Sequence, residues 1–348
     1  MDKKLKEEPV KPTVYVTKGT SIKCQFRLPS DAIDVHHVGP ADIEYIAALG
    51  DSITTAYGSR NTTTQNFSEN YFGNSFVTGG DENLFGHVTL ANILKEFNPN
   101  LRGISHGSGY GLNSGLNVAV SGRTVDDLPR QAEILVSTFR DRYQPSDYQN
   151  KWKLINIFIG TNDIGNLSCY RTEPPVPVAT YKAKLEECIS IIKKDLPKTI
   201  ISIIGMWNPQ VTIEAKSIIS EGKRLTCPGA ADIVEKREQL CTSYRNKAFE
   251  IQNEQKFSSD DFTVVVQPFL ENMVKPITTA DGKYDLSFYA EDVFHLSKQG
   301  NSKFATWLWN NLLEPVGAKT TNALDNQTFS TIQCPDVNKP YIRTVRNS

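Results

Sequence analysis

Three side chains far apart in the sequence have the types needed for acyl transfer. Ser52 follows Gly50 and Asp51 directly after an apolar run, and a serine hydroxyl is a useful nucleophile only beside a base. His295 is the candidate base. It lies just ahead of the last predicted helix and has an acid three residues before it, Asp292, which could fix the imidazole tautomer. The sequence therefore predicts a Ser–His–Asp arrangement.

Both parts of this arrangement have an ordinary structural alternative. Gly, Asp and Ser are common turn residues, so residues 50–52 could be a simple turn. Asp292 and His295 could merely cap the last helix. The choice depends on whether the rest of the chain supplies donors for an oxyanion.

Candidate donors follow other apolar runs. They are the backbone N–H groups of Ser52 and Gly122 and the side-chain amide of Asn162. Because the carboxyl ends of parallel strands meet at one edge of a sheet, we expect these residues to converge. The spacing of histidines and carboxylates suggests no metal cluster, and the glycine-rich residues 103–115 lack the spacing of a nucleotide site. We therefore expect no metal and no cofactor.

The elements that would position these residues alternate between strand and helix. Apolar runs predict five strands, at 45–49, 116–120, 154–159, 199–206 and 262–266. Helical spacing predicts helices at 84–97, 128–139, 179–194, 233–255 and 297–313. This alternation predicts an α/β fold with three α/β/α layers around a five-stranded parallel sheet of flavodoxin-like type. We expect an N-terminal extension (1–37), a single domain that carries the candidate catalytic residues (38–316) and a C-terminal tail packed on that domain (317–348).

Composition excludes several classes of partner. The 348 residues carry a net charge of −1 without a dense basic segment, which gives no electrostatic case for nucleic acid. No run approaches the roughly 18 apolar residues of a membrane span, and no apolar leader is visible in the first 25 residues.

Cysteines and glycosylation sequons bear on the compartment. Six cysteines allow about 15 pairings, and the sequence does not choose among them. We expect the local pairs Cys169–Cys188 and Cys227–Cys241, with Cys24–Cys334 joining the chain ends; six buried reduced thiols are the alternative. Sequons occur at Asn61, Asn66, Asn166 and Asn326, no more often than chance would place them. A secreted glycoprotein is the favoured interpretation.

Four blocks of the chain resemble those of the GDSL (SGNH) hydrolases, in the family's order. The blocks are Gly50-Asp51-Ser52, residues 117–122, Gly160-Thr161-Asn162-Asp163 and Asp292-Val293-Phe294-His295. Residues 40–52, 261–269, 309–317 and the tail around Cys334-Pro335 further resemble the phospholipase B subgroup of animals. The resemblance covers about residues 38–348. Thr161 and Gly165-Asn166 depart from the subgroup's pattern.

The resemblance implies a nucleophile at Ser52, a base at His295, an orienting acid at Asp292 and oxyanion donors at Ser52, Gly122 and Asn162. It also implies metal-independent hydrolysis of fatty-acyl esters of glycerophospholipids and lysophospholipids, with transient contact with a membrane or micelle surface. Two alternatives stay open: an esterase for acetylated sugars or short-chain esters, and an inactive extracellular binding protein on the same fold. The oligomeric state stays open as well.

Overall fold

The computed structural model describes residues 22, 24, 32–60, 69–167, 173, 176–208, 211–212, 214–215, 230–279, 281–324 and 331–348. At its centre is one four-stranded sheet in the order β1-β2-β3-β4, and every neighbouring pair is parallel. The strands are β1 (Ile43–Gly50), β2 (Trp152–Phe158), β3 (Thr199–Ile204) and β4 (Phe262–Gln267). Nearly all their residues are buried, as expected of a parallel sheet that is covered on both faces.

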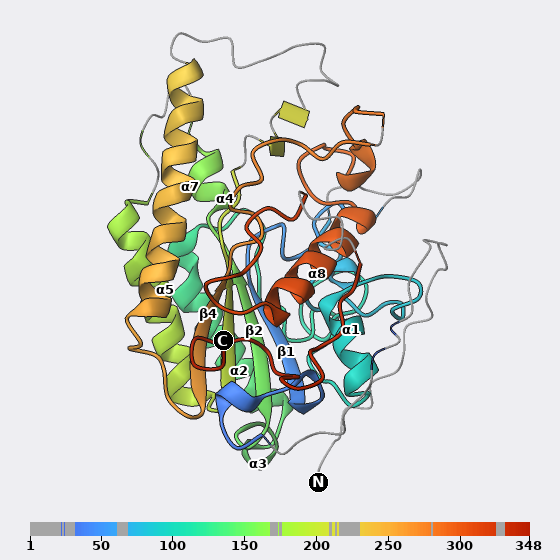
Figure 1. Cartoon of the computed structure of the whole chain (residues 1–348), viewed down its shortest axis with the longest axis vertical. Coiled ribbons are helices and arrows are strands. Elements are labelled where there is room, and N and C mark those ends of the chain that lie inside the picture. The colour runs from blue at the N-terminus through green and yellow to red at the C-terminus, as the bar shows by residue number, and fades with distance from the viewer. Residues whose placement is uncertain are drawn as a thin grey trace.

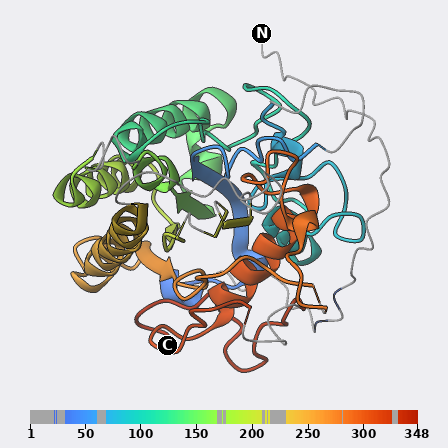
Figure 2. The same cartoon turned by 90° about the horizontal axis from the view of Figure 1, so that it is seen from above.

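Helices lie on both sides of this sheet, which makes three layers (Figures 1 and 2). One layer holds α2 (Leu128–Arg142), α5 (Val178–Asp195) and α7 (Ala230–Asn253), with α5 packed against the other two. The opposite layer holds α1 (Leu90–Phe97) and α8 (Lys298–Leu313), which contact each other. The predicted α/β class and the three layers are therefore confirmed.

Short helices complete the described elements. They are α3 (Pro145–Tyr148), α4 (Thr161–Gly165), η1 (Val35–His37), η2 (Pro40–Asp42), η3 (Phe72–Asn74), η4 (Val125–Asp127) and η5 (Leu286–Phe288). Of these, α4 directly follows β2 and η4 directly precedes α2, so both lie at the edge where the strands end.

The prediction of a fifth strand at 116–120 is wrong. This stretch runs beside β1 and forms a single bridge, between Ala48 and Asn117. The ladder stops after this bridge because the next bridge, between Gly50 and Ala119, would need the N–H of Gly50 to donate to Val118 O, and that N–H donates instead to Gln131 Oε1 at 2.8 Å. Besides the two backbone bonds of this bridge, one more, from Val120 N to Gly50 O, joins the stretch to β1, so it covers the outer edge of the sheet without forming a strand.

The helix predicted at 84–97 begins only at Leu90. Thr89 is its N-cap, since the Thr89 hydroxyl accepts the N–H of Asn92 at 3.0 Å. Before that cap, the N–H groups of Gly86 and His87 both donate to Asn83 O, which closes a turn. The other long helices lie within a few residues of their predicted bounds.

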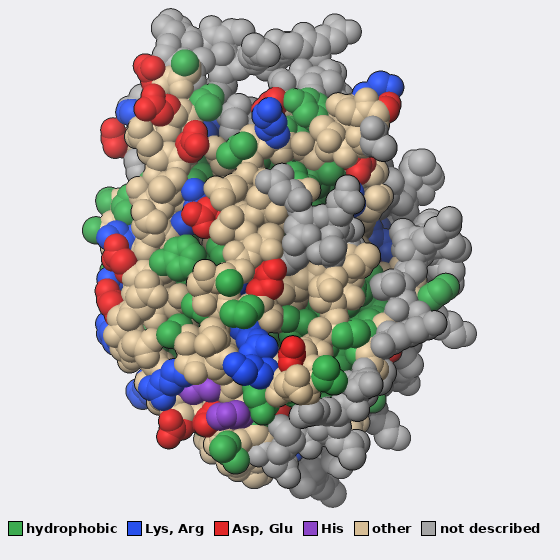
Figure 3. Space-filling view, viewed as in Figure 1, with side chains coloured by type: hydrophobic (Ala, Val, Ile, Leu, Met, Phe, Trp, Pro, Cys, Tyr) green, Lys and Arg blue, Asp and Glu red, His purple; other side chains and the backbone are tan. Residues whose placement is uncertain are grey.

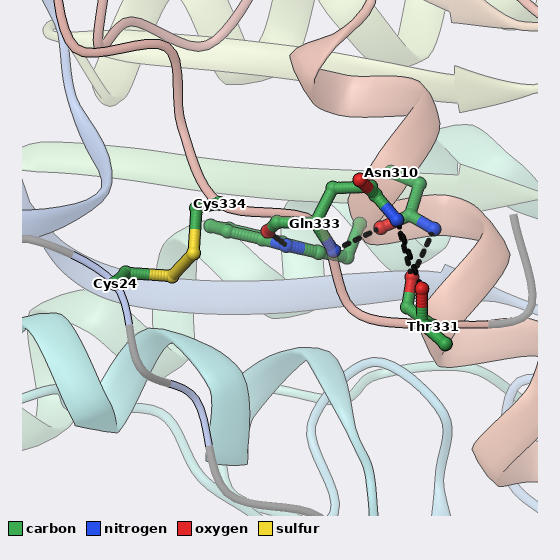
Figure 4. The surroundings of a disulfide bond; sticks show 6 residues. Cys24, Asn310, Thr331, Gln333 and Cys334 are labelled. Carbon is green, nitrogen blue, oxygen red and sulfur yellow. Dashed lines mark hydrogen bonds between the residues drawn. A yellow bond between two sulfur atoms is a disulfide. The ribbon is translucent and has the colours of Figure 1, made fainter. Parts of the chain in front are cut away.

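The two ends of the chain are joined by a disulfide between Cys24 and Cys334, as predicted (Figure 4). Next to it, the N–H of Gln333 donates to Asn310 Oδ1 at 2.9 Å, which fastens the tail to α8. Farther along, Ile342 N donates to Val38 O at 2.9 Å.

The other two predicted cysteine pairs are wrong. Cys188 and Cys241 are free and buried in the apolar interior, while Cys169 and Cys227 lie outside the described residues. Cys188 lies on α5, and Cys241 lies on α7, where its thiol donates to Trp207 O at 3.2 Å. Desolvation raises the pKa of Cys241 to about 12 and that of Cys188 further, so both stay protonated as small apolar side chains.

Charges of both signs alternate on the side of the molecule formed by α5 and α7 (Figure 3). Lys182 on α5 pairs with Glu250 and Glu254 near the end of α7, and Lys256 pairs with Glu186. Such exposed pairs contribute little to stability, because solvent screens their charges. Among the described residues, we find no helix that is both long and apolar enough to span a membrane.

Candidate active site

Three of the predicted site residues form one hydrogen-bonded chain. His295 Nε2 lies 2.8 Å from Ser52 Oγ, and His295 Nδ1 lies 2.5 Å from Asp292 Oδ2. The nucleophile and base are 243 positions apart in the sequence and meet because β1 and the segment before α8 end on the same side of the sheet. With Nδ1 donating to the carboxylate, Nε2 is free to accept the serine proton, which is the tautomer that general-base catalysis needs.

The turn from Asp292 to His295 holds the acid and the base in register. Asp292 Oδ1 accepts two backbone N–H groups, from Phe294 at 3.0 Å and from His295 at 2.9 Å. Val293 between them has φ +51°, an uncommon conformation for a β-branched residue. This backbone conformation lets one carboxylate oxygen cap the turn while the other faces the imidazole.

The hydrogen bonds to Asp292 keep its carboxylate charged. Burial alone would raise its pKa, but the bonds from His295 and from the two backbone N–H groups outweigh burial and lower the pKa to about 2. The rings of Tyr57 and Phe294 lie beside the imidazole, with centroids 4.7 Å and 4.9 Å away. The imidazole of His295 is thus held by its hydrogen bond to the Asp292 carboxylate and by packing against the rings of Tyr57 and Phe294.

The nucleophile lies in a tight turn at the end of β1. Gly50 has φ +154°, and a Cβ there would lie 2.3 Å from Phe158 O, so this position needs glycine. Gln131 of α2 binds both backbone groups of Gly50, accepting its N–H at 2.8 Å and donating to its carbonyl at 2.9 Å. Asp51 then caps the turn by accepting the N–H of Ile53 at 3.0 Å.

Gly122 and Asn162, the other candidate oxyanion donors, are joined through one residue. Asn162 Nδ2 donates to Arg123 O at 2.8 Å, directly after Gly122. An amide carries two hydrogens, so the second can still serve an oxyanion. Gly122 has φ +78°, and no heavy atom lies within 4 Å of the position of a Cβ there, so its N–H lies on an open stretch of backbone. On the nucleophile side, Ser121 Oγ lies 3.1 Å from Thr55 Oγ1.

Two buried acids flank this edge and belong to no predicted role. Asp51 precedes the nucleophile, and Asp163 follows Asn162 and accepts the N–H of Val125 at 3.2 Å. Burial is the main cause that raises the pKa of each carboxyl group to about 7, and the charge of Asp163 adds to the rise at Asp51. A charge on Asp163 therefore opposes ionisation of Asp51 beside the nucleophile.

The remaining histidines contact other parts of the structure. His36 and His37 lie in η1 near the tail, His87 is buried with Nε2 3.1 Å from Lys298 O, and His106 lies 3.5 Å from Asp81. Sequence analysis missed Gln131, Thr55 and Asn70, whose side chains bind the backbone or the hydroxyl groups around Ser52. No motif marks them, because their partners are up to 81 positions away.

Comparison with known proteins places this geometry in a family. The family model described as GDSL-like Lipase/Acylhydrolase matches residues 46–308, which include every predicted site residue. The chain belongs to the GDSL-like lipase/acylhydrolase family. The membrane-associated phospholipase B1 of Homo sapiens is 36% identical over 96% of this chain, and that of Rattus norvegicus is 33% identical over 98%. Each match covers 24% of the relative, so the chain spans about a quarter of the length of these curated relatives.

Solved structures similar to this GDSL-family chain include bacterial esterases. An acetylxylan esterase from Geobacillus stearothermophilus is 16% identical with a TM-score of 0.37, and the match covers 75% of this chain and 90% of that one. A GDSL-like lipase from Bacteroides thetaiotaomicron is 10% identical with a TM-score of 0.34, covering 75% and 83%.

Proposed function

We propose that the chain is a serine esterase that hydrolyses fatty-acyl esters of glycerophospholipids and lysophospholipids through an acyl-enzyme. The observation that carries the proposal is the hydrogen-bonded chain from Ser52 through His295 to Asp292. The substrate class is supported by the similarity to phospholipase B1 over nearly the whole chain.

In the first half of the reaction, Ser52 Oγ attacks the ester carbonyl carbon while His295 Nε2 takes the hydroxyl proton. Asp292 stabilises the resulting imidazolium. The carbonyl oxygen becomes an oxyanion, to which the N–H groups of Ser52 and Gly122 and the amide of Asn162 donate. When the intermediate collapses, the carbon–oxygen bond to the glycerol side breaks, and His295 returns the proton to the leaving alcohol.

In the second half, water attacks the acyl-enzyme. His295 takes a proton from this water and later returns it to Ser52 Oγ, which releases the fatty acid. The nucleophile, the base and the oxyanion donors all come from the chain itself, so the proposal includes no metal or cofactor step.

The test is product analysis on phosphatidylcholine with different acyl chains at its two positions. The wild-type chain should release both fatty acids, and Ser52→Ala should release neither while keeping its melting temperature. Ser190→Ala, which removes an exposed hydroxyl on α5, should behave like the wild type. Hydrolysis by Ser52→Ala would refute the nucleophile, whereas turnover of short-chain esters alone would favour the alternative esterase.

We also propose that this catalytic domain spans 38–316, between the N-terminal extension (1–37) and the tail (317–348), and that it works outside the cytosol. The Cys24–Cys334 disulfide supports an oxidising compartment. Asn166 supports glycosylation, since it begins a sequon and is exposed. Contact with a lipid surface would be transient and would deliver the ester to Ser52. A glycosidase-sensitive mass shift of secreted protein that is smaller in Asn166→Gln would test this placement.

A further inference from the structure

Asn70 lies at the centre of a polar cluster beside the nucleophile turn. Its Oδ1 lies 2.7 Å from Thr55 Oγ1 and accepts a hydrogen bond from Ser121 Oγ, and its Nδ2 donates to Tyr110 OH at 3.0 Å. Thr55 Oγ1 also lies 3.0 Å from the carbonyl oxygen of Ser52, so its single hydroxyl hydrogen can go to either oxygen. One half-buried amide thus joins the nucleophile turn, the segment before Gly122 and the loop that carries Tyr110.

The backbone of Asn70 is fixed to the same turn. Asn70 forms an antiparallel bridge with Tyr57, and Gly58 N donates to Glu69 O at 2.9 Å. Tyr57 N donates to Ser52 O at 3.0 Å, and the Tyr57 ring packs on the imidazole of the base. The Asn70 amide therefore has a fixed position relative to the nucleophile. A side chain that is hydrogen-bonded to this amide is held in a fixed position as well.

The Asn70 amide binds Ser121, which directly precedes the candidate oxyanion donor Gly122. Gly122 has no packing neighbour at its Cβ position and a positive φ, so it does not fix the direction of its own N–H. Its position depends on the residues on either side. The Asn162 amide holds Arg123 O at 2.8 Å on one side, and Asn70 holds the Ser121 hydroxyl on the other.

We propose that Asn70 is a positioning residue that keeps the Gly122 N–H directed at the oxyanion through the hydroxyl of Ser121. This inference rests on the proposed function, in which Gly122 donates to the oxyanion. Donors stabilise a transition state strongly only when they are already aligned, and a small displacement of a reacting group is enough to lose much of the rate.

The direct test is Asn70→Ala, measured as kcat and KM on a soluble ester. We expect kcat to fall about 10- to 100-fold, less than for loss of a whole oxyanion donor, while KM changes less than about threefold. Reaction with a fluorophosphonate, whose phosphoryl oxygen occupies the same site, should slow in parallel. Asn113→Ala is the matched control, because that exposed amide donates only to Ser108 O and should leave all three measurements unchanged.

A double-mutant cycle tests whether Asn70 acts on Gly122 through Ser121. If Asn70 acts through Ser121, then Ser121→Ala should reproduce the loss in kcat, and Asn70→Ala combined with Ser121→Ala should be no slower than either single variant. Ser121→Ala also keeps the test decisive if Asn70→Ala fails to fold.

Two results would overturn the inference: normal kcat in folded Ser121→Ala, or multiplying losses in the double variant. Failure of the proposed function would look different, since Ser52→Ala would then stay active or the wild type would not react with the fluorophosphonate.

Discussion

Replacing Asp292 by Asn keeps the shape of the side chain and changes only what it can donate and accept. Oδ1 of Asp292 accepts the N–H groups of Phe294 and His295, so the carbonyl oxygen of an Asn must take that position. The new NH₂ group then faces His295 Nδ1, which must accept rather than donate. The imidazole is forced into the tautomer with its proton on Nε2, and it cannot take the proton of Ser52.

The size of the effect follows from the cost of the alternatives. To recover the working tautomer, the Asn must turn its NH₂ toward the two backbone N–H groups, leaving both without an acceptor. Each such group costs about 1–3 kcal/mol, so the working arrangement lies about 2–6 kcal/mol above the inactive one. At about 1.4 kcal/mol per factor of ten, kcat should fall about 30- to 10⁴-fold.

The assay is steady-state hydrolysis of a soluble ester, with circular dichroism to show that Asp292→Asn is folded. Asp285→Asn is the control, because Asp285 caps η5 nearby and binds Ser287 N at 3.1 Å without touching His295. It should stay within about twofold of the wild type, as expected for a residue outside the reacting groups. Retention of more than a tenth of wild-type kcat by Asp292→Asn would refute the tautomer argument.

The lowered pKa of Asp292 leads to a prediction of how stability depends on pH. Its pKa in the folded chain, about 2, is below the ordinary value of 3.8, so folding favours the charged form. Its contribution to stability is therefore complete above about pH 4 and is lost as the pH falls toward 2. Because its side chain is 38% exposed, solvent screening limits this contribution to about 1 kcal/mol. Urea unfolding measured between pH 4 and pH 2 should show this loss in the wild type and a smaller one in Asp292→Asn.

Three further perturbations test other parts of the site. Asn162→Ala should lower kcat about 10²- to 10³-fold, the usual cost of one oxyanion donor, and near-normal kcat would contradict that role. Gln131→Met removes the acceptor of a buried backbone N–H without leaving a large cavity, so urea unfolding should show a loss of about 1–3 kcal/mol, with exposed Gln239→Met as control. Because burial raises the pKa values of Asp51 and Asp163 to about 7, unfolding free energy should fall as pH rises from 4 to 7, and Asp163→Asn should flatten that fall.

Local sequence determined most of the elements. The strands at the centre of the sheet are mostly apolar and buried over their whole length, and such runs have few other stable positions in a protein of this size. The helices followed from their spacing and from nearby caps, and the error at α1 arose because Thr89 caps a helix that sequence spacing alone would extend back to residue 84. Ser52, Gly122, Asn162, Asp292 and His295 could be selected because each carries a distinctive side chain or glycine beside a strand end or helix start.

Tertiary structure alone decided which groups bind one another. The stretch at 116–120 has a strand's composition, but the side chain of Gln131 takes the N–H of Gly50 that the next bridge of a ladder would need. Cys188 and Cys241 have partners at plausible spacing, yet each is enclosed in the apolar interior between α5, α7 and the sheet. In the sequence, Asn70 and Gln131 look like ordinary polar residues. A hydrogen bond acts only over a short distance in space, and their partners come within that distance only when the chain folds, so no sequence pattern identifies them.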